Sequence, residues 1–412
     1  MGYVIYGLSV LVQMLIIVVT VYQILVGVFA FIGKDNGKET DNKQYKYALV
    51  VAAHNEQDVI GETIDSLKNI DYDKDLFDIF VVADNCTDNT AKISSEHGAI
   101  VYERSSEDKR GKGYALNWMF DKIFEMEDKY DILCVFDADN IIHPDFLKNI
   151  NRKFNRGYKA VQGYINTKNP NDSWITASYA MSFWSINMVY QTARSNLGLS
   201  NQICGTGFGV RTDVIKEYGW SATCLAEDME FTMQLNMNDI PVGWAYDAVV
   251  YDEKPLTLAQ SAKQRTRWMQ GHADVASRFF LPLMKKAFKE KNIIPFDCAM
   301  YLTQPYFLIA GLFVLIISTM QLFFPALKVW FLTSLSLPPV VWNFLIVFQF
   351  FYTPFVLWWD NRLNNKMLMY YIPYMLFTYT WMPIAVVGVL RKNKKEWSHT
   401  KHTRTMSLSE IE

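Results

Sequence analysis

The first 33 residues contain no charged side chain, and this feature restricts the fold more than any other. A helix over Gly2–Ile32 would be about 45 Å long, against a bilayer core of about 30 Å. The stretch has neither the basic start nor the small-residue cleavage site of a signal peptide. We therefore predict a retained transmembrane helix in residues 1–33, tilted or protruding from the bilayer.

Positive charge follows this stretch and does not precede it. The polar linker predicted at residues 34–46 contains four lysines: Lys34, Lys38, Lys43 and Lys46. Because basic residues accumulate on the cytoplasmic side of a span, the N-terminus is expected outside and the following domain in the cytoplasm. The sequence thus predicts a cell-membrane protein with its water-soluble domain in the cytoplasm, and the apolar runs after residue 293 would make it multi-pass.

Long apolar runs return in a predicted membrane region at residues 294–392. The three candidate spans are Cys298–Phe324, Val340–Trp359 and Met367–Leu390. Three crossings would leave the basic tail, residues 393–412, outside, which conflicts with its charge. Either the last candidate, interrupted by Pro373 and Pro383, does not fully cross, or Ala326–Trp359 crosses more than once. The first alternative is favoured, because each proline removes a backbone donor and invites a kink.

The composition of the part in between is that of a water-soluble domain. Half of the whole chain is hydrophobic and 20% is charged, with a formal net charge of −2 and no basic stripe interleaved with aromatics. These values give no reason to expect nucleic acid as a partner. The five cysteines are scattered without Cys-x-x-Cys spacing, which argues against a disulfide framework and structural zinc and suits a reducing cytoplasm.

From residue 47 onward, short apolar segments alternate with amphipathic ones. The predicted strands are Tyr47–Ala53, Ile79–Ala83, Ile100–Tyr102 and Ile132–Phe136, and the predicted helices are Glu56–Asn69, Asp88–His97 and Tyr114–Phe124. This alternation is typical of βαβ units in a mainly parallel sheet. The fold class is therefore α/β.

Two carboxylates follow the most apolar of these strands. Asp137 and Asp139 come directly after Ile132–Phe136, at the strand end where ligands bind such sheets. In extended backbone, residues i and i+2 face the same way, so both carboxylates could hold one Mg²⁺ or Mn²⁺ ion. The alternative is an acidic turn without a ligand.

The other strands are also followed by polar groups. His54-Asn55-Glu56 follows the first strand, and residues 84–90 follow the second. After the third, Lys112 lies between two glycines at the start of a helix, where its ammonium group and backbone N–H groups can face a phosphate. Taken alone, such a segment is more often a solvated loop.

Seven short motifs occur in order between residues 47 and 271. They are HNE (54–56), ADNCTDNTA (83–91), RGKGYALN (110–117), DAD (137–139), CGTG (204–207), AED (226–228) and QRTRW (264–268). With this set the chain resembles the membrane-integrated family 2 glycosyltransferases, which include the synthases of cellulose, mixed-linkage β-glucan, hyaluronan and poly-N-acetylglucosamine. The resemblance implies a GT-A (Rossmann-like) domain at residues 47–272, with a mixed, mainly parallel sheet, between N- and C-terminal transmembrane helices.

The resemblance implies which residues would bind the nucleotide. Asp84 matches the carboxylate that binds uridine, with Glu56 nearby. Asp137 and Asp139 match the pair that holds the nucleotide diphosphate through Mg²⁺ or Mn²⁺. Lys112 matches the lysine that contacts this diphosphate.

The resemblance also implies the acceptor side of the site. Asp228 matches the catalytic base, next to Glu227 in the acceptor site, although Ala226 stands where many relatives have threonine. Cys204, Gly205 and Thr206 match the acceptor-binding turn. Without the other motifs, Glu227-Asp228 would be interpreted as the acidic first turn of a helix.

The QRTRW motif lies in a predicted helix, Leu258–Met269. By resemblance, Trp268 lies under the acceptor sugar, while Gln264 and Arg267 serve the pyrophosphate side. A tryptophan on a helix more often packs in a core or interface, but the two polar neighbours favour the sugar platform. The following segment, predicted as an interfacial amphipathic helix at residues 273–293, combines phenylalanines with lysines and would press the site against the membrane.

The expected reaction is inverting transfer from a UDP-sugar. A carboxylate must take the proton of the acceptor hydroxyl, and metal and cations must neutralise the departing UDP. With one base and no separate nucleophile, attack comes from the face opposite the leaving group, so an α-linked donor gives a β-linked product. UDP-glucose is favoured over UDP-N-acetylglucosamine on a general likeness to β-glucan synthases.

Three functions remain open from sequence. The first is polymerisation of a β-linked polysaccharide, with the growing chain as acceptor, translocation across the lipid bilayer and accessory export proteins as further partners. Tryptophans that could contact such a chain, or form an interfacial belt, are Trp330, Trp342, Trp358, Trp359 and Trp381. The second is transfer of one sugar to a membrane lipid such as a sphingolipid or polyprenyl phosphate. The third, a non-catalytic membrane partner, is disfavoured because every carboxylate that the chemistry needs is present.

Overall fold

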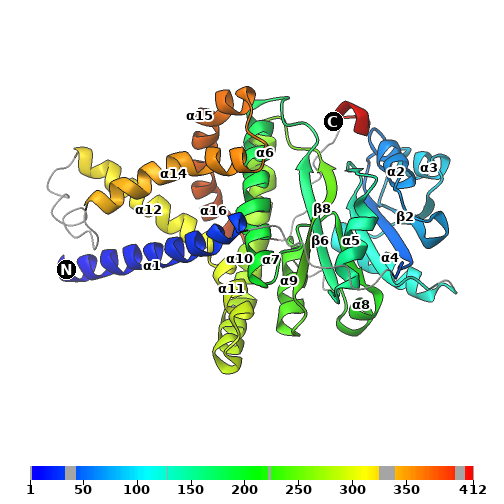
Figure 1. Ribbon diagram of the computed structural model, residues 1–412, viewed down its shortest axis with the longest axis horizontal. Coiled ribbons are helices and arrows are strands. Elements are labelled where there is room, and N and C mark those ends of the chain that lie inside the picture. Colours follow the sequence, from blue (N-terminus) through cyan, green and yellow to red (C-terminus); the bar gives the residue numbers. More distant parts are fainter. Residues whose placement is uncertain are drawn as a thin grey trace.

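The computed structural model describes residues 2–32, 43–127, 129–220, 224–323, 339–394 and 404–411. Most of the predicted linker and part of the basic tail lie outside these ranges. Figure 1 shows an α/β part on one side, a bundle of long helices on the other, and a layer of helices between them.

One mixed sheet forms the centre of the α/β part. Its strands are β1 (Tyr47–Ala53), β2 (Phe77–Asp84), β3 (Ile100–Arg104), β4 (Ile132–Asp137), β5 (Ile141–Ile142), β6 (Ala160–Thr167), β7 (Phe208–Arg211) and β8 (Val242–Asp252). Their order is β3-β2-β1-β4-β7-β6-β8-β5. Among these strands, four pairings are parallel and three, all involving β7 or β5, are antiparallel. The prediction of a mixed, mainly parallel sheet is confirmed, and the four strands predicted from sequence are all present.

The sheet is covered on both faces, as the unbroken apolar strands require. Alternate residues of β1 point to opposite cores: Tyr47 and Leu49 to one, Ala48 and Val50 to the other. Helices α2, α3 and α5 cover the first face, and α4, α8 and α9 cover the second. These helices cover the two faces and leave the carboxyl ends of β1, β2 and β4 open.

The helices of this part are short. They are α2 (Ile60–Lys68), α3 (Thr90–Glu96), α4 (Lys112–Glu125), α5 (Phe146–Asn155), α8 (Thr212–Tyr218), α9 (Glu227–Met237) and the one-turn helix η2 (Lys74–Leu76). Helix α2 begins four residues later than predicted, because Asn55 has a left-handed backbone (φ 55°) and residues 56–59 form a turn. Helix α4 begins two residues earlier, since Gly111 (φ 118°) provides its N-cap.

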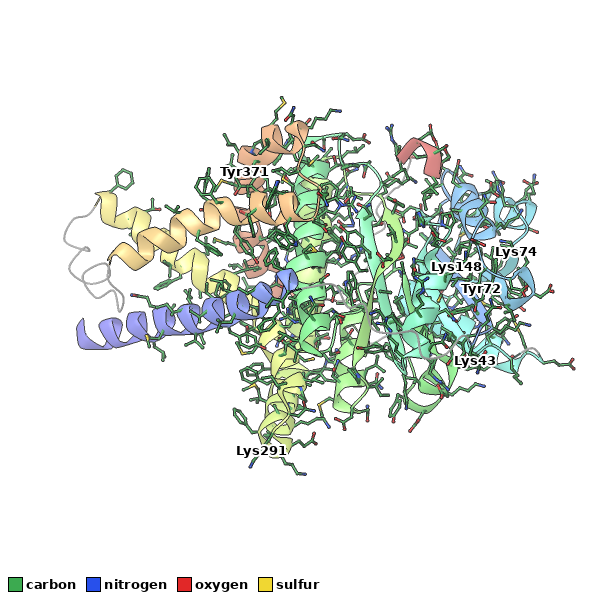
Figure 2. The ribbon with its side chains drawn as sticks, in the orientation of Figure 1. Lys43, Tyr72, Lys74, Lys148, Lys291 and Tyr371 are labelled. Atoms are coloured by element: carbon green, nitrogen blue, oxygen red, sulfur yellow. The ribbon has the colours of Figure 1, made fainter. Side chains whose placement is uncertain are left out.

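Further helices form the layer between the sheet and the apolar bundle. They are α6 (Trp174–Ile186), the π-helical η3 (Asn187–Thr192), α7 (Ala193–Leu197), α10 (Leu258–Glu290) and α11 (Ile293–Leu302). Helix α10 joins the predicted helix Leu258–Met269 and the predicted amphipathic segment into one element of 33 residues. It ends at Lys291, a left-handed C-cap that lies at the tip of this layer in Figure 2.

The remaining helices are apolar. They are α1 (Gly2–Val28), with the 3-10 turn η1 (Phe29–Phe31), α12 (Gln304–Phe323), α14 (Pro339–Trp359), α15 (Asn365–Tyr379) and α16 (Trp381–Leu390); a short helix, α17 (Leu408–Ile411), lies in the tail. Among the described residues, Leu11–Phe31 and Asn365–Leu390 are long and apolar enough to cross a membrane. The pair α11 and α12, bent by 47°, passes the same test if it is one span.

The placement of α15 and α16 differs from that of the other apolar helices. In Figure 1, α1, α12 and α14 extend away from the α/β part. Helices α15 and α16 instead run along α6 and α10, across the direction of α1, α12 and α14. Thr380 separates the two helices, because α15 ends at Tyr379 and α16 begins at Trp381. By length and composition this segment can cross, so its predicted interfacial position stays a prediction. Trp330 and the side chain of Trp342 lie outside the described residues.

A buried ion pair fastens the N-terminal helix to the layer. The Arg194 guanidinium of α7 makes two hydrogen bonds to the Asp297 carboxylate of α11, at 2.7 and 2.9 Å. Tyr22 of α1 donates to the same carboxylate at 2.7 Å.

The lysines labelled in Figure 2 on the α/β part, Lys43, Lys74 and Lys148, lie on the side of the molecule away from the apolar helices.

Candidate active site

The predicted nucleotide-binding residues lie at the carboxyl ends of the strands. Asp84 ends β2 and is 6% exposed, and its carboxylate accepts a hydrogen bond from the buried Arg104 guanidinium at the end of β3. Glu56 follows β1 and is 7% exposed, with its backbone N–H donating to Thr90 Oγ1 at 2.9 Å. A charge-assisted bond of the Asp84–Arg104 kind fixes the carboxylate in one orientation. Two of the predicted uridine-side residues thus lie on neighbouring strand ends.

Three carboxylates meet beyond the end of β4. One oxygen each of Asp137, Asp139 and Asp252 lies within 4.8 Å of the others. Asp139 is 2% exposed, and its Oδ2 accepts from the Glu253 backbone N–H at 3.3 Å. Hard oxygen donors at this spacing fit a Mg²⁺ or Mn²⁺ ion that keeps further positions for water or phosphate. The two predicted carboxylates lie together and Asp252 joins them, while their role as metal ligands stays a prediction.

Lys112 joins this cluster to the acceptor turn. Its ammonium group donates to the Asp137 carboxylate and, at 2.8 Å, to the Gly205 carbonyl. Burial lowers the pKa of this lysine, but the charges of Asp137, Glu227 and Asp228 outweigh burial and raise it. The ammonium group therefore stays charged at the first turn of α4, where helix-terminal N–H groups also favour a phosphate.

Glu227 and Asp228 form the first turn of α9. Asp228 Oδ1 accepts from the Met229 backbone N–H at 2.8 Å, which is the hydrogen bond of an acidic first turn. Both side chains keep some exposure, but the surrounding protein removes most of their water. Desolvation raises the pKa of Asp228 and of Glu227, and the mutual repulsion of the two carboxylates raises that of Glu227 further. A carboxylate with a raised pKa is a better proton acceptor.

The predicted acceptor turn lies directly beside Asp228. Gly205 has φ +85°, and a Cβ atom there would lie 3.4 Å from Asp228 Oδ2. The Cys204 backbone N–H donates to Gln162 Oε1 at 2.9 Å, whereas the Thr206 hydroxyl accepts from the Asp137 backbone N–H at 3.1 Å. Thr206 therefore connects the turn to β4, and the turn lies between the carboxylate cluster and Asp228, the predicted base.

The QRTRW residues lie on α10, within the layer between the sheet and the apolar helices. Trp268 is half-buried and stacks on Trp381 of α16, with ring centroids 6.3 Å apart and planes 18° apart. Gln264 Oε1 accepts from the Tyr179 hydroxyl at 3.0 Å. Arg267 is half-buried on the same helix, and its positive charge partly offsets the rise in the pKa of Glu227 that burial causes.

The match to a known family decides the identity. The sequence model of the family described as "Glycosyltransferase like family 2" matches residues 44–271, which is more than half of the chain. The chain belongs to glycosyltransferase family 2.

Curated relatives of this family 2 glycosyltransferase include several named proteins. It is 29% identical over 272 residues to the probable glycosyltransferase YdaM of Bacillus subtilis, matching 64% of this chain and 63% of that protein. It is 27% identical over 231 residues to the β-monoglucosyldiacylglycerol synthase of a Nostoc species, matching 54% and 48%. The chain thus spans about half to two thirds of the length of these two relatives. It is 25% identical over 330 residues to the poly-β-1,6-N-acetyl-D-glucosamine synthase of Staphylococcus epidermidis, matching 77% and 76%.

A solved structure supports the fold along most of the chain. The mannosyltransferase PcManGT of Pyrobaculum calidifontis, in complex with GDP-Man and Mn²⁺, superposes with a TM-score of 0.61. The superposition covers 94% of this chain and 99% of that one at 15% sequence identity. The GT-A fold of this family 2 glycosyltransferase is therefore confirmed.

Several residues at the candidate site do not belong to the seven sequence motifs and were not predicted. Asp252 ends β8, and Arg104 ends β3. Lys254 is buried and its ammonium group lies 2.5 Å from Asp252 Oδ2. The signal for Asp252 was present, since the apolar run 248–251 stops at Asp252-Glu253-Lys254 as β4 stops at Asp137, but nothing local shows that the two strand ends meet.

Proposed function

We propose that this glycosyltransferase transfers a hexose from a UDP-sugar to an acceptor hydroxyl with inversion at C1. The supporting observation is the connection through Lys112 and Gly205, which brings the diphosphate side, Asp137, next to the base, Asp228. The acceptor proton passes to the Asp228 carboxylate while the acceptor oxygen bonds to C1 and the bond from C1 to UDP breaks. No second carboxylate is needed as nucleophile.

Leaving-group charge is the main barrier that the diphosphate side must lower. A divalent ion held by Asp137, Asp139 and Asp252 would neutralise the departing UDP. Lys112 adds a fixed positive charge, and Arg104 holds Asp84 in place for the uridine. Glu56, Gln264 and Arg267 complete the proposed nucleotide side.

We propose that the acceptor is a growing β-linked polysaccharide. The poly-β-1,6-N-acetyl-D-glucosamine synthase is matched over 77% of this chain, well beyond the family region at residues 44–271. Trp268, stacked on Trp381 between the sheet and the apolar helices, offers an aromatic platform for the terminal sugar. Cys204, Gly205 and Glu227 would contact the same sugar. The product would leave between the membrane helices toward the other side of the bilayer.

Transfer of one sugar to a lipid is the second candidate. It is supported by the likeness to β-monoglucosyldiacylglycerol synthases, which is confined to 54% of the chain. In both cases we place the catalytic domain on the cytoplasmic face of the cell membrane.

Product analysis tests the proposal. Purified protein is incubated separately with radiolabelled UDP-glucose and UDP-N-acetylglucosamine and Mn²⁺, with and without diacylglycerol, and the products are sized and digested with linkage-specific hydrolases. Long β-linked chains from one donor without added lipid support polymerisation. A product of one sugar on diacylglycerol supports the second candidate, and an α-linked product contradicts inversion.

A further inference from the structure

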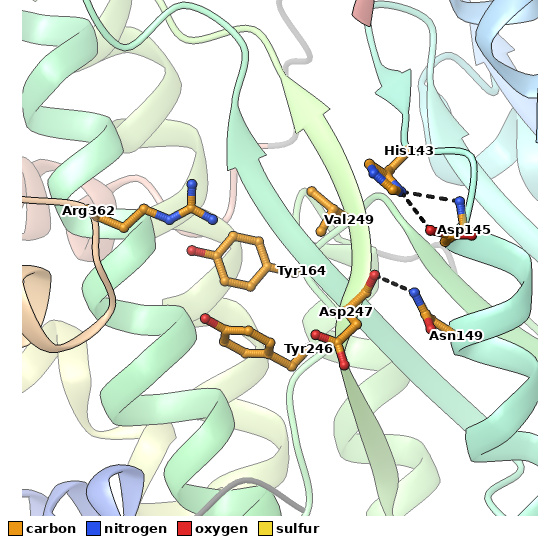
Figure 3. Close-up of a pocket in the computed structure, with 8 residues that line it drawn as sticks. All are labelled: His143, Asp145, Asn149, Tyr164, Tyr246, Asp247, Val249 and Arg362. Carbon is orange, nitrogen blue, oxygen red and sulfur yellow. Dashed lines mark hydrogen bonds and ion pairs between the residues drawn. The ribbon is translucent and has the colours of Figure 1, made fainter. Parts of the chain in front are cut away.

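A second concave site lies between the catalytic sheet and the turn that joins α14 to α15 (Figure 3). It encloses about 330 Å³. Its walls come from β6 and β8 (Tyr164 and Tyr246), from the segment before α5 (His143), and from the α14–α15 turn (Arg362). None of the residues assigned above to sugar transfer lines it.

An irregularity of β8 builds one wall of this pocket. Strands β6 and β8 pair in register up to Gly163 and Ala245, but the next pair is Tyr164 with Val249. Residues 246–248 are therefore extra on β8, and such a bulge redirects side chains out of the ladder. Gly163 permits the arrangement, because a Cβ atom there would lie 2.6 Å from the Ala248 carbonyl oxygen. The pocket is thus a built feature of the sheet.

The lining carries the Arg362 cation at one end and the carboxylates of Asp247 and Asp145 away from it. The Arg362 guanidinium lies over the ring of Tyr164, 5.6 Å from its centroid, and its Nε forms an ion pair with Asp360 Oδ2 at 3.9 Å. Asp360 is engaged by the Tyr246 hydroxyl at 2.5 Å. Asp247 is exposed beyond the two tyrosines from Arg362, as Figure 3 shows. A ligand carrying both an anion and a cation complements this arrangement.

Arg362 brings the border of the apolar helices to one side of the pocket. Arg362 follows the end of α14, where Trp358 is 60% and Trp359 is 47% exposed. On α15, Met369 is 77% and Ile372 is 70% exposed. Exposed tryptophans at the end of an apolar helix are typical of the headgroup level of a bilayer, and the apolar side chains of α15 need lipid to cover them. Arg362 therefore lies at the depth of phospholipid headgroups.

We propose that this pocket binds the zwitterionic headgroup of a membrane phospholipid, with its phosphate on Arg362 and its ammonium group between Asp247 and the ring of Tyr246. Guanidinium groups bind phosphate through paired hydrogen bonds, and ammonium groups bind to carboxylates and aromatic faces. The volume accommodates such a headgroup. A lipid held here would connect β8 of the catalytic sheet to the α14–α15 turn, whatever sugar the enzyme transfers.

Native mass spectrometry of the full-length, delipidated protein tests this site. The protein is given equal amounts of phosphatidylethanolamine and phosphatidylglycerol, and retained lipid is counted. We expect wild type to retain about threefold more phosphatidylethanolamine. Arg362→Gln should lose this excess together with most of the bound lipid. Asp247→Asn, at an exposed position that does not threaten folding, should retain both lipids equally.

The matched control is Lys366→Gln, which removes an exposed cation of α15 that does not line the pocket, and it should retain lipid as wild type does. Equal retention by wild type, Arg362→Gln and Asp247→Asn would overturn the proposal. Soluble glycerophosphoethanolamine separates the two sources of the headgroup. Its binding with no retention of phospholipid would show a site for a soluble ligand and overturn the membrane source.

Discussion

At the scale of single residues, direct contacts connect the two halves of the candidate site. The Lys112 ammonium group touches Asp137 on one side and the Gly205 carbonyl on the other, and Gly205 adjoins Asp228. A side chain larger than hydrogen at position 205 would be strained at φ +85° and would approach the base. Lys112 and Gly205 therefore connect Asp137, on the predicted donor side, to Asp228, on the predicted acceptor side.

We expect Asp228→Asn to lower transfer at least about 1,000-fold while UDP binding stays within about twofold of wild type. The change removes the proton acceptor and keeps the shape of the first turn of α9. Turnover with the preferred donor and UDP titration calorimetry measure the two effects. Turnover within tenfold of wild type would contradict the assignment of the base.

The pH dependence follows from the same residue. Desolvation raises the pKa of Asp228 above its ordinary value of about 3.9. The base acts only when deprotonated, so activity should rise with pH through an apparent pKa above this value, and fall as pH drops below it. A kcat/KM profile from pH about 4 to about 9 measures this limb. A limb at or below the ordinary aspartate value would mean that another group is the base.

Asp252 provides a test of the metal cluster. Asp252→Asn should raise the Mn²⁺ concentration for half-maximal activity at least about tenfold, because one charged ligand is lost. Wild-type activity should vanish in EDTA and return with Mn²⁺ or Mg²⁺. Asp247→Asn, on the same strand but outside the cluster, is the control and should leave the metal requirement unchanged. Activity that ignores chelation would show that the three carboxylates hold no ion.

Trp268→Ala should separate acceptor from donor binding. The ring stacks on Trp381 and, by the proposed assignment, serves the acceptor and not the uridine, so its loss should abolish chain synthesis and leave UDP affinity within about threefold of wild type. Slow hydrolysis of the donor to water should remain. Product sizing and UDP titration measure the two effects, and unchanged chain length would remove Trp268 from the acceptor site.

At the scale of elements, α10 connects the catalytic turn to the last apolar helices. A Cβ atom on Gly271 would lie 2.5 Å from Ala226 Cβ, directly before Glu227-Asp228. A Cβ atom on Gly388 of α16 would lie 2.5 Å from Met269 Cβ. Helix α10 is thus in close contact with the turn before Glu227-Asp228 on one side and with α16 on the other, and α16 also supplies Trp381 to the proposed acceptor platform.

Gly271→Ala should therefore disturb both stability and activity. The added methyl group overlaps Ala226, and overpacking of this kind costs about 1–3 kcal/mol. We expect a lower midpoint of thermal unfolding and at least about tenfold lower turnover. Gly311→Ala on α12 is the matched control, because its nearest neighbour, the flexible end of Met382, is 3.4 Å away. Equal behaviour of the two variants would contradict the close contact.

At the scale of the whole molecule, the orientation in the membrane depends on α15 and α16. If α1, α12 and α14 cross and α15–α16 lies at the interface, the basic tail and the catalytic domain share one side, as charge requires. An epitope after Glu412 and one between the exposed residues Glu107 and Asp108 should then be accessible only in inside-out vesicles. An epitope before Met1 should be accessible in intact cells. A tail on the opposite side from the Glu107 epitope would show that Asn365–Leu390 crosses.

The sequence alone determined what depends on neighbouring residues. Strand β1 has the predicted limits, because a run of seven apolar β-formers between polar residues is too short for a typical helix and favours a buried strand. The Asp137 and Asp139 carboxylates lie in one cluster because side chains two apart in extended backbone share a face. The charge-free N-terminal stretch is helical for an equally local reason.

The tertiary structure decided what depends on residues far apart in the chain. Asp252 reaches the metal cluster because β8 pairs with β5, which follows Asp139, across more than 100 residues. Arg104 meets Asp84 because β2 and β3 pair in parallel, and Trp268 meets Trp381 because α16 packs on α10. Such contacts are selected by the total burial and pairing of the folded chain, which no local pattern of residues encodes.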